Sequence, residues 1–212
     1  QPVAKLAERN VNRLFDVAML MDCSQCPIHP KLQPVFYEYA AKHSATARKN
    51  GAAPILFMSW AYQDKPEMTA QLAAEYVKAG NANNALVVPA GLAFAASLAK
   101  RPDVTLHIAD KRHPTLAGTY LAACTVLASV YKTSPVGLKY TAGLPADVAA
   151  HLQAVAWETS RSFHAREGRG IHRLDADEVG GALGAPEPQH APLRVGDDPV
   201  VPRVARPHHH RH

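Results

Sequence analysis

The stretch APILFMSWA (residues 53–61) decides the fold class, because it is a continuous apolar run without polar alternation. A strand of this kind is typical of a parallel sheet that helices cover on both faces. Two further short apolar runs, LFDVAMLM (14–21) and NALVVPAG (84–91), have the same character. A helical pattern follows each of the three. The sequence therefore predicts an α/β protein with a parallel sheet.

The expected helices have apolar positions at helical spacing, and several have a Pro near the start or a Gly near the end. VTLHIA (104–109) is expected to be a short strand or an extended loop. The alternation of strands and helices predicts a three-layer α/β/α sandwich. Only three or four strands are visible, so we expect the chain to lack the first strands of such a sheet. The predicted helices are 31–51, 66–81, 91–102, 114–132 and 145–166.

The bulk composition is that of a soluble globular protein. The 212 residues are 47% hydrophobic and 19% charged. No apolar run reaches the roughly 18 residues that a membrane span needs, so none is expected. The start, QPVAKLAERNVNR, lacks both Met and the apolar middle of a secretion signal. We therefore expect the natural start to lie upstream, and the sequence assigns no localisation. The net charge of +5 is scattered, and we expect no nucleic-acid partner.

The composition changes toward the end of the chain. No Phe, Tyr or Trp occurs after Phe163, and residues 175–212 contain six prolines and end in RPHHHRH. Such a segment cannot bury enough apolar area to offset its ordering entropy. We expect one domain over 1–174 and a disordered, Pro/Arg/His-rich tail over 175–212, whose histidines are solvated and hold no metal.

The stretch ADKRHPTLAGTYLAA (109–123) places Asp110 three residues before His113 at a predicted helix start. An Asp that accepts a hydrogen bond from one imidazole nitrogen fixes the tautomer and lets the other nitrogen act as a general base. A second interpretation is structural. Asp110 and His113 then only shape the start of a helix whose first residue is Pro114.

The block from Asp110 through His113, Pro114 and Gly118 to Tyr120 resembles the last block of the SGNH/GDSL hydrolase superfamily. FDVAMLM, ILFMSWAYQD, VVPAGLAFAASL and TSPVGL occur in the order found in bacterial members, so the resemblance covers roughly 14–138. It implies a flavodoxin-like parallel sheet and a serine esterase or deacylase that acts on a carbohydrate or other small acyl ester, without a cofactor. His113 would be the general base and Asp110 its orienting acid.

The sequence departs from this family at two places. No Gly-Asp-Ser block occurs, so the family's nucleophile is absent from these residues. In LMDCSQCP, the family's oxyanion donor is replaced by Met21 and Asp22, and Ser24 or Gln25 would have to substitute. Trp60 is expected either to line a substrate groove or to close the edge of the core. A chain without its nucleophile is alternatively a non-catalytic α/β domain that binds through the exposed strand LFDVAMLM.

The three cysteines allow another interpretation. An odd, small number does not indicate a disulfide framework. Cys23-x-x-Cys26 after a strand is also the position of a thiol redox pair, and with His29 it would offer three zinc ligands. The plain alternative is two small residues on a loop. Cys124 is expected to be an inert core thiol.

Overall fold

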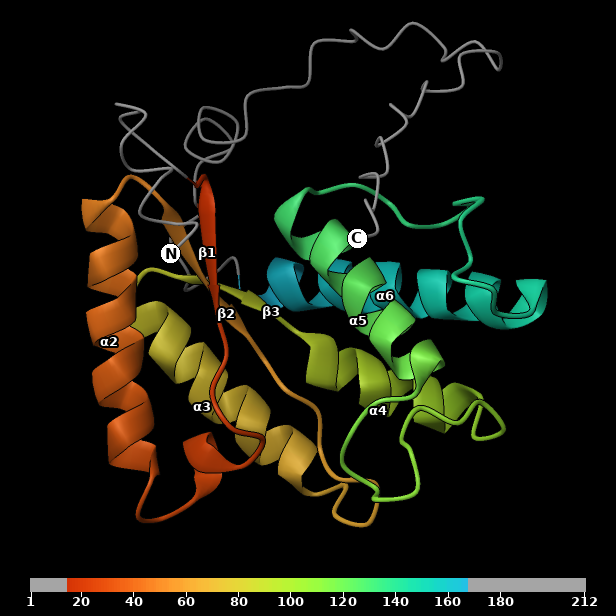
Figure 1. The fold of residues 1–212 in the computed structure, drawn as a ribbon, viewed down its shortest axis with the longest axis horizontal. Coiled ribbons are helices and arrows are strands. Elements are labelled where there is room, and N and C mark those ends of the chain that lie inside the picture. Colours follow the sequence, from red (N-terminus) through yellow and green to blue (C-terminus); the bar gives the residue numbers. More distant parts are fainter. Residues whose placement is uncertain (1–14, 168–212) are drawn as a thin grey trace, which may run out of the picture.

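A computed structural model describes residues 15–167 (Figure 1). Three strands, β1 (Val17–Leu20), β2 (Ala53–Phe57) and β3 (Leu86–Val88), form a parallel sheet in the order β1-β2-β3. The other elements are the 3₁₀ turn η1 (Cys26–Ile28) and the helices α2 (Gln33–Lys49), α3 (Met68–Ala82), α4 (Ala90–Lys100), α5 (Leu116–Val130) and α6 (Ala146–Glu167). The predicted tail, 175–212, lies outside the described residues.

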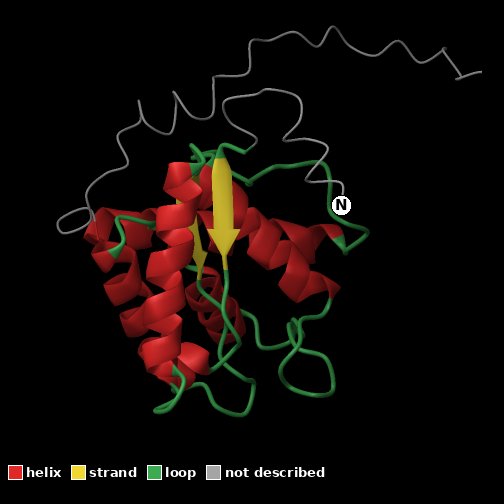
Figure 2. Cartoon of the chain, turned by 60° about the vertical axis from the view of Figure 1, so that its left-hand side comes forward, coloured by secondary structure: helices red, strands yellow, loops and turns green. Residues whose placement is uncertain are grey.

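Side chains of β2 alternate between two apolar cores, which is why this strand reads as a continuous apolar run. Ile55 and Phe57 pack with α4, α5 and α6 on one face of the sheet. Leu56 and the following Met58 pack with α2 and α3 on the other face. Figure 2 shows the strands enclosed between helices on both sides. The predicted three-layer α/β/α arrangement is confirmed.

The strands are shorter than their apolar runs, since β2 stops at Phe57 and β3 is only three residues long. The apolar residues beyond β2 still matter, because Met58 is fully buried and Ala61 nearly so. VTLHIA forms no strand of the sheet. Within residues 15–167, its only β-type pairing is an isolated antiparallel bridge between His107 and Pro114.

The first strand is at an edge of the described sheet and is incompletely covered. β1 pairs with β2 from Val17–Ala53 to Leu20–Leu56. Met19 is 44% exposed and Met21, just after the strand, is 64% exposed. None of the described helices, from α2 to α6, is long and apolar enough to span a membrane.

Candidate functional site

Asp110 and His113 lie on a tight loop between the extended segment 104–108 and α5. The backbone N–H of Ile108 donates to the carbonyl oxygen of His113 at 2.9 Å, so the chain folds back on itself here. Lys111, in the turn, has a left-handed φ of 64°, a conformation that few non-glycine residues adopt. The loop therefore brings an acid and a histidine three residues apart to face each other.

The carboxylate of Asp110 is fully engaged with its own loop. Its Oδ1 accepts hydrogen bonds from the backbone N–H groups of Arg112 at 2.8 Å and His113 at 2.9 Å. Its Oδ2 lies 2.5 Å from His113 Nδ1. The side-chain bond to His113, followed by the two backbone donors, holds the pKa of Asp110 well below its usual range. An ionised Asp110 thus orients the imidazole through Nδ1.

The pair is open to solvent. The side chain of His113 is 75% exposed and that of Asp110 is 40% exposed. With Nδ1 occupied by the carboxylate, the Nε2 edge is the one that remains for proton transfer. The predicted acid–histidine contact is therefore present, in an accessible position.

Trp60, in the segment that follows β2, contacts this loop. Its indole Nε1–H donates to the carbonyl oxygen of Arg112 at 2.9 Å. Its ring stacks on Phe94 of α4, with centroids 4.4 Å apart. Trp60 is half-buried, so the structure gives it the role of closing the core edge. Whether it also lines a substrate groove stays a prediction.

Further contacts fix the loop against the segment that follows β2. The backbone N–H of Gln63 donates to the carbonyl of Lys111 at 2.9 Å, and the Arg112 guanidinium lies 4.6 Å from the Tyr62 ring centre. In the segment just before the loop, Nε2 of the buried His107 lies 3.0 Å from the Ala61 carbonyl oxygen. This anchoring residue had no recognisable pattern in the sequence.

The N-cap of α5 is a threonine that follows the acid–histidine pair. The helix begins at Leu116, two residues later than predicted, and Thr115 is its N-cap. The Thr115 hydroxyl accepts from the Gly118 N–H at 3.2 Å and donates to the Thr105 carbonyl at 2.8 Å. Thr115 is therefore the N-cap of α5, and neither Asp110 nor His113 fills that position. Asp110 still shapes the turn that leads to the helix, so the structural interpretation of the pair stays a prediction.

Gly118 allows α5 to approach the extended segment before the loop. A Cβ built there would lie 2.5 Å from the carbonyl oxygen of Leu106 and 3.0 Å from the Phe94 ring. Glycine is the residue that permits this close backbone approach. The Gly in the sequence block thus positions the loop relative to the helix.

The structure does not bring a nucleophile to His113. Within residues 15–167, no serine, threonine or cysteine side chain is hydrogen-bonded to it. A different Ser–His pair exists, with Ser97 Oγ 3.0 Å from His151 Nε2, between α4 and α6. Ser97 is fully buried, so a substrate cannot reach it. This pair is a contact between helices.

Ser24 and Gln25, the predicted substitutes for the oxyanion donor, are exposed on the loop after β1. This loop and the one that holds Trp60 meet where the Ser59 hydroxyl donates to the Ser24 carbonyl at 3.4 Å. In Figure 1, the loops that follow β1 and β2 and the loop that precedes α5 lie along the lower edge of the molecule. Binding by either side chain remains a prediction.

Cys23 and Cys26 form a disulfide, which is the pairing that the redox interpretation of Cys23-x-x-Cys26 allowed. The bond spans only three positions, so it needs no framework of paired cysteines. The zinc interpretation also changes, because the third potential ligand atom within 4.8 Å of the two sulfurs belongs to Asp22 and not to His29. His29 Nδ1 instead accepts the Lys31 N–H at 3.2 Å. Cys124 is a buried free thiol, as predicted.

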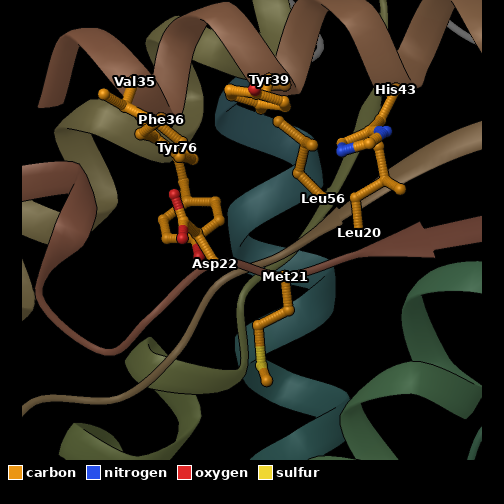
Figure 3. Close-up of a pocket in the computed structure, with 10 residues that line it drawn as sticks. Leu20, Met21, Asp22, Val35, Phe36, Tyr39, His43, Leu56 and Tyr76 are labelled. Carbon is orange, nitrogen blue, oxygen red and sulfur yellow. The ribbon is translucent and has the colours of Figure 1, made fainter. Parts of the chain in front are cut away.

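Two cavities adjoin these elements. One, of about 300 Å³, lies between α2 and the end of β1; Figure 3 shows Tyr39 and His43 of α2 above Leu20 and Met21. The other, of about 370 Å³, lies between α3 and α4, behind the Asp110–His113 loop. Its lining includes Tyr62, Gln63, Phe94, Leu98 and His107, so it borders the residues that anchor this loop.

Comparisons with known proteins give the fold and leave the chemistry open. No family model matches the sequence, and no curated protein matches it. A crystal structure of a DUF4886 family protein from Bacteroides uniformis is similar, with a TM-score of 0.59 and 16% identity. The match covers 79% of this chain and 68% of that one. At this identity the likeness shows a shared α/β/α fold, and the fold does not determine the function.

Proposed function

We propose that this protein is an ester hydrolase in which Asp110 and His113 form the acid–base pair. The observation that carries the proposal is the 2.5 Å contact between Asp110 Oδ2 and His113 Nδ1, in a loop whose histidine is largely exposed. The resemblance of this block to SGNH/GDSL hydrolases supports the same roles. The family's substrates suggest an acyl ester of a carbohydrate or another small alcohol.

In this reaction, His113 Nε2 accepts the proton of a hydroxyl nucleophile as the oxygen attacks the acyl carbon. Asp110 stabilises the resulting imidazolium, and His113 then gives the proton to the departing alcohol. In the family a serine supplies the attacking oxygen, and water, activated by the same histidine, then releases the acyl group from it. The 212 residues contain no Gly-Asp-Ser block for this serine, so the experiment also has to locate the nucleophile. The apolar cavity behind the loop is a candidate site for a small acyl group.

The experiment compares hydrolysis of p-nitrophenyl acetate by the 212-residue chain and by His113→Ala and Asp110→Asn. Loss of a general base costs roughly 100- to 10,000-fold in rate, so His113→Ala should fall to background. The chain has 12 histidines, and free imidazole also cleaves this ester. His43→Ala, at another exposed histidine, is therefore the matched control and should keep the wild-type rate.

A fluorophosphonate probe followed by peptide mass spectrometry locates the nucleophile. Labelling of one serine that depends on His113 would support the proposal and name the residue, and Ser97→Ala should leave it unchanged. Equal rates for wild type and His113→Ala, together with no labelled serine, would overturn it. The result would then favour the alternative hypothesis of a non-catalytic binding domain. The exposed Met19 of β1 and Met21 just after it fit that hypothesis.

A further inference from the structure

The disulfide between Cys23 and Cys26 joins residues that are close in sequence, so it adds little as a structural crosslink. It closes a loop of four residues between β1 and η1, two neighbouring elements that the chain already connects. A crosslink restrains the unfolded chain less as the loop becomes shorter, so this bond contributes little in that way. It ties no distant parts of the fold together.

The two sulfurs are not equivalent. Cys23 is exposed on the loop, whereas Cys26 is half-buried at the start of η1, and the next residue, Pro27, is buried. An attacking thiol therefore has better access to Cys23 Sγ. The other cysteine, Cys124, is buried in the core on the opposite face of the sheet and cannot compete.

One backbone donor lies on Cys23 Sγ. The N–H of Cys26 is shared between this sulfur, at a nitrogen–sulfur distance of 3.0 Å, and the Cys23 carbonyl oxygen, at 3.2 Å. Asp22 Oδ1 accepts the N–H of Cys23 at 2.7 Å and so fixes the backbone just before the pair. A donor aimed at one sulfur stabilises its charged form and makes it the better nucleophile and leaving group near neutral pH.

We infer that Cys23–Cys26 is a thiol–disulfide exchange site, with Cys23 as the exchanging sulfur and a dithiol of a protein or small molecule as its partner. A thiolate of the partner attacks Cys23 Sγ and forms a mixed disulfide, and Cys26 leaves as a thiolate that takes up a proton. The second thiol of the partner then attacks the mixed disulfide and releases Cys23. The partner is oxidised by two electrons, and the pair gains two electrons and two protons.

Ser59 connects the disulfide loop to the segment after β2 that contacts the Asp110–His113 loop. Its hydroxyl donates to the Ser24 carbonyl, between the two cysteines, and the next residue is Trp60, which holds the Asp110–His113 loop. The exchange chemistry itself uses neither Asp110 nor His113. It therefore holds whether or not the protein hydrolyses esters.

The test uses the full chain in a Cys124→Ala background, so that each further variant has one thiol. Cys26→Ser leaves Cys23, and Cys23→Ser leaves Cys26; each reacts with oxidised glutathione at pH 7 and is followed by mass spectrometry. We expect Cys23 to form the mixed disulfide at least about tenfold faster, as its exposure and backbone donor require. Equal rates, or a faster Cys26, would overturn the inference.

A second measurement uses the native pair and needs neither cysteine replaced. The chain is equilibrated in buffers of reduced and oxidised glutathione, and its free thiols are trapped with a maleimide of high mass. A reversible transition of Cys23 and Cys26 within these buffers supports the exchange site. A pair that stays fully oxidised throughout, in protein shown by circular dichroism to be folded, is a structural disulfide and contradicts it.

Discussion

Trp60 donates its indole N–H to the carbonyl oxygen of Arg112, across 52 positions of sequence, and so ties the loop after β2 to the loop that holds Asp110 and His113. The same ring stacks on Phe94, so one side chain connects the apolar core to the exposed acid–histidine pair. This contact makes the position of the loop depend on the core beneath it.

Trp60→Phe should keep an aromatic ring against Phe94 and lose the hydrogen bond to Arg112. We expect a loss of about 1 kcal/mol in the free energy of unfolding, measured in urea, and faster amide exchange in residues 110–113. Trp157→Phe, at the other tryptophan of the chain, is the control. If the two variants show the same exchange in this loop, the indole bond does not hold it.

Gly118→Ala should destabilise the protein even though alanine favours helices. At a typical helix position this change stabilises by about 1 kcal/mol. Here the new Cβ would lie 2.5 Å from the Leu106 carbonyl oxygen, so α5 or the 104–108 segment must shift. We expect a net loss of about 1–3 kcal/mol by urea unfolding. Thr119→Ala, at the exposed neighbouring position, should change stability little, and a stabilised Gly118→Ala would contradict this packing.

Thr115→Ala separates capping of α5 from the role of the acid–histidine pair. It removes the acceptor for the Gly118 N–H and the donor to the Thr105 carbonyl, and we expect a loss of about 1–2 kcal/mol in unfolding free energy. Thr115→Ser keeps both bonds and should stay near wild type. His113→Ala should be much milder than Thr115→Ala. A reversed order would favour the interpretation that Asp110 and His113 shape the start of the helix.

His164 makes stability depend on pH. Burial, and next the charge of Lys132, lower its pKa from 6.5 to about 4 in the folded protein. The unfolded chain therefore binds more protons between pH 6.5 and 4, and stability falls as the pH decreases through this window. At pH 5 this group alone should cost about 2 kcal/mol relative to pH 7.5. His164→Leu should lose less stability than wild type between these pH values in urea unfolding; an equal loss would show that His164 is not responsible.

Much of the fold could be predicted from the sequence because its patterns are local. The continuous apolar runs placed three parallel strands, and helical spacing placed all five described α-helices within a few residues. The end of a run did not mark the end of a strand. Met58 and Ala61 are apolar because the core extends past β2, and only packing shows this.

The acid–histidine pair could also be predicted, since Asp110 and His113 lie three residues apart and a single turn brings them together. The residues that hold the turn could not. Gln63 and Trp60 donate to its carbonyl oxygens from the segment after β2, and His107 ties the segment before it to Ala61. These hydrogen-bond partners have no signal in the sequence, and Thr115 caps a helix whose start was expected at Pro114. The Cys23–Cys26 bond likewise required the local backbone geometry, because the sequence alone left a redox pair, a metal site and an incidental pair open.

By itself, the sequence determined the layers of the fold and the presence of an acid and a base near one helix, because hydrophobic periodicity and short spacing are properties of neighbouring residues. Only the tertiary structure decided that the imidazole is exposed and fixed by Asp110, that Ser97 is buried, and that Cys23 is more exposed than Cys26. Exposure and access depend on which distant segments pack over a side chain, and those contacts arise only when the chain has folded.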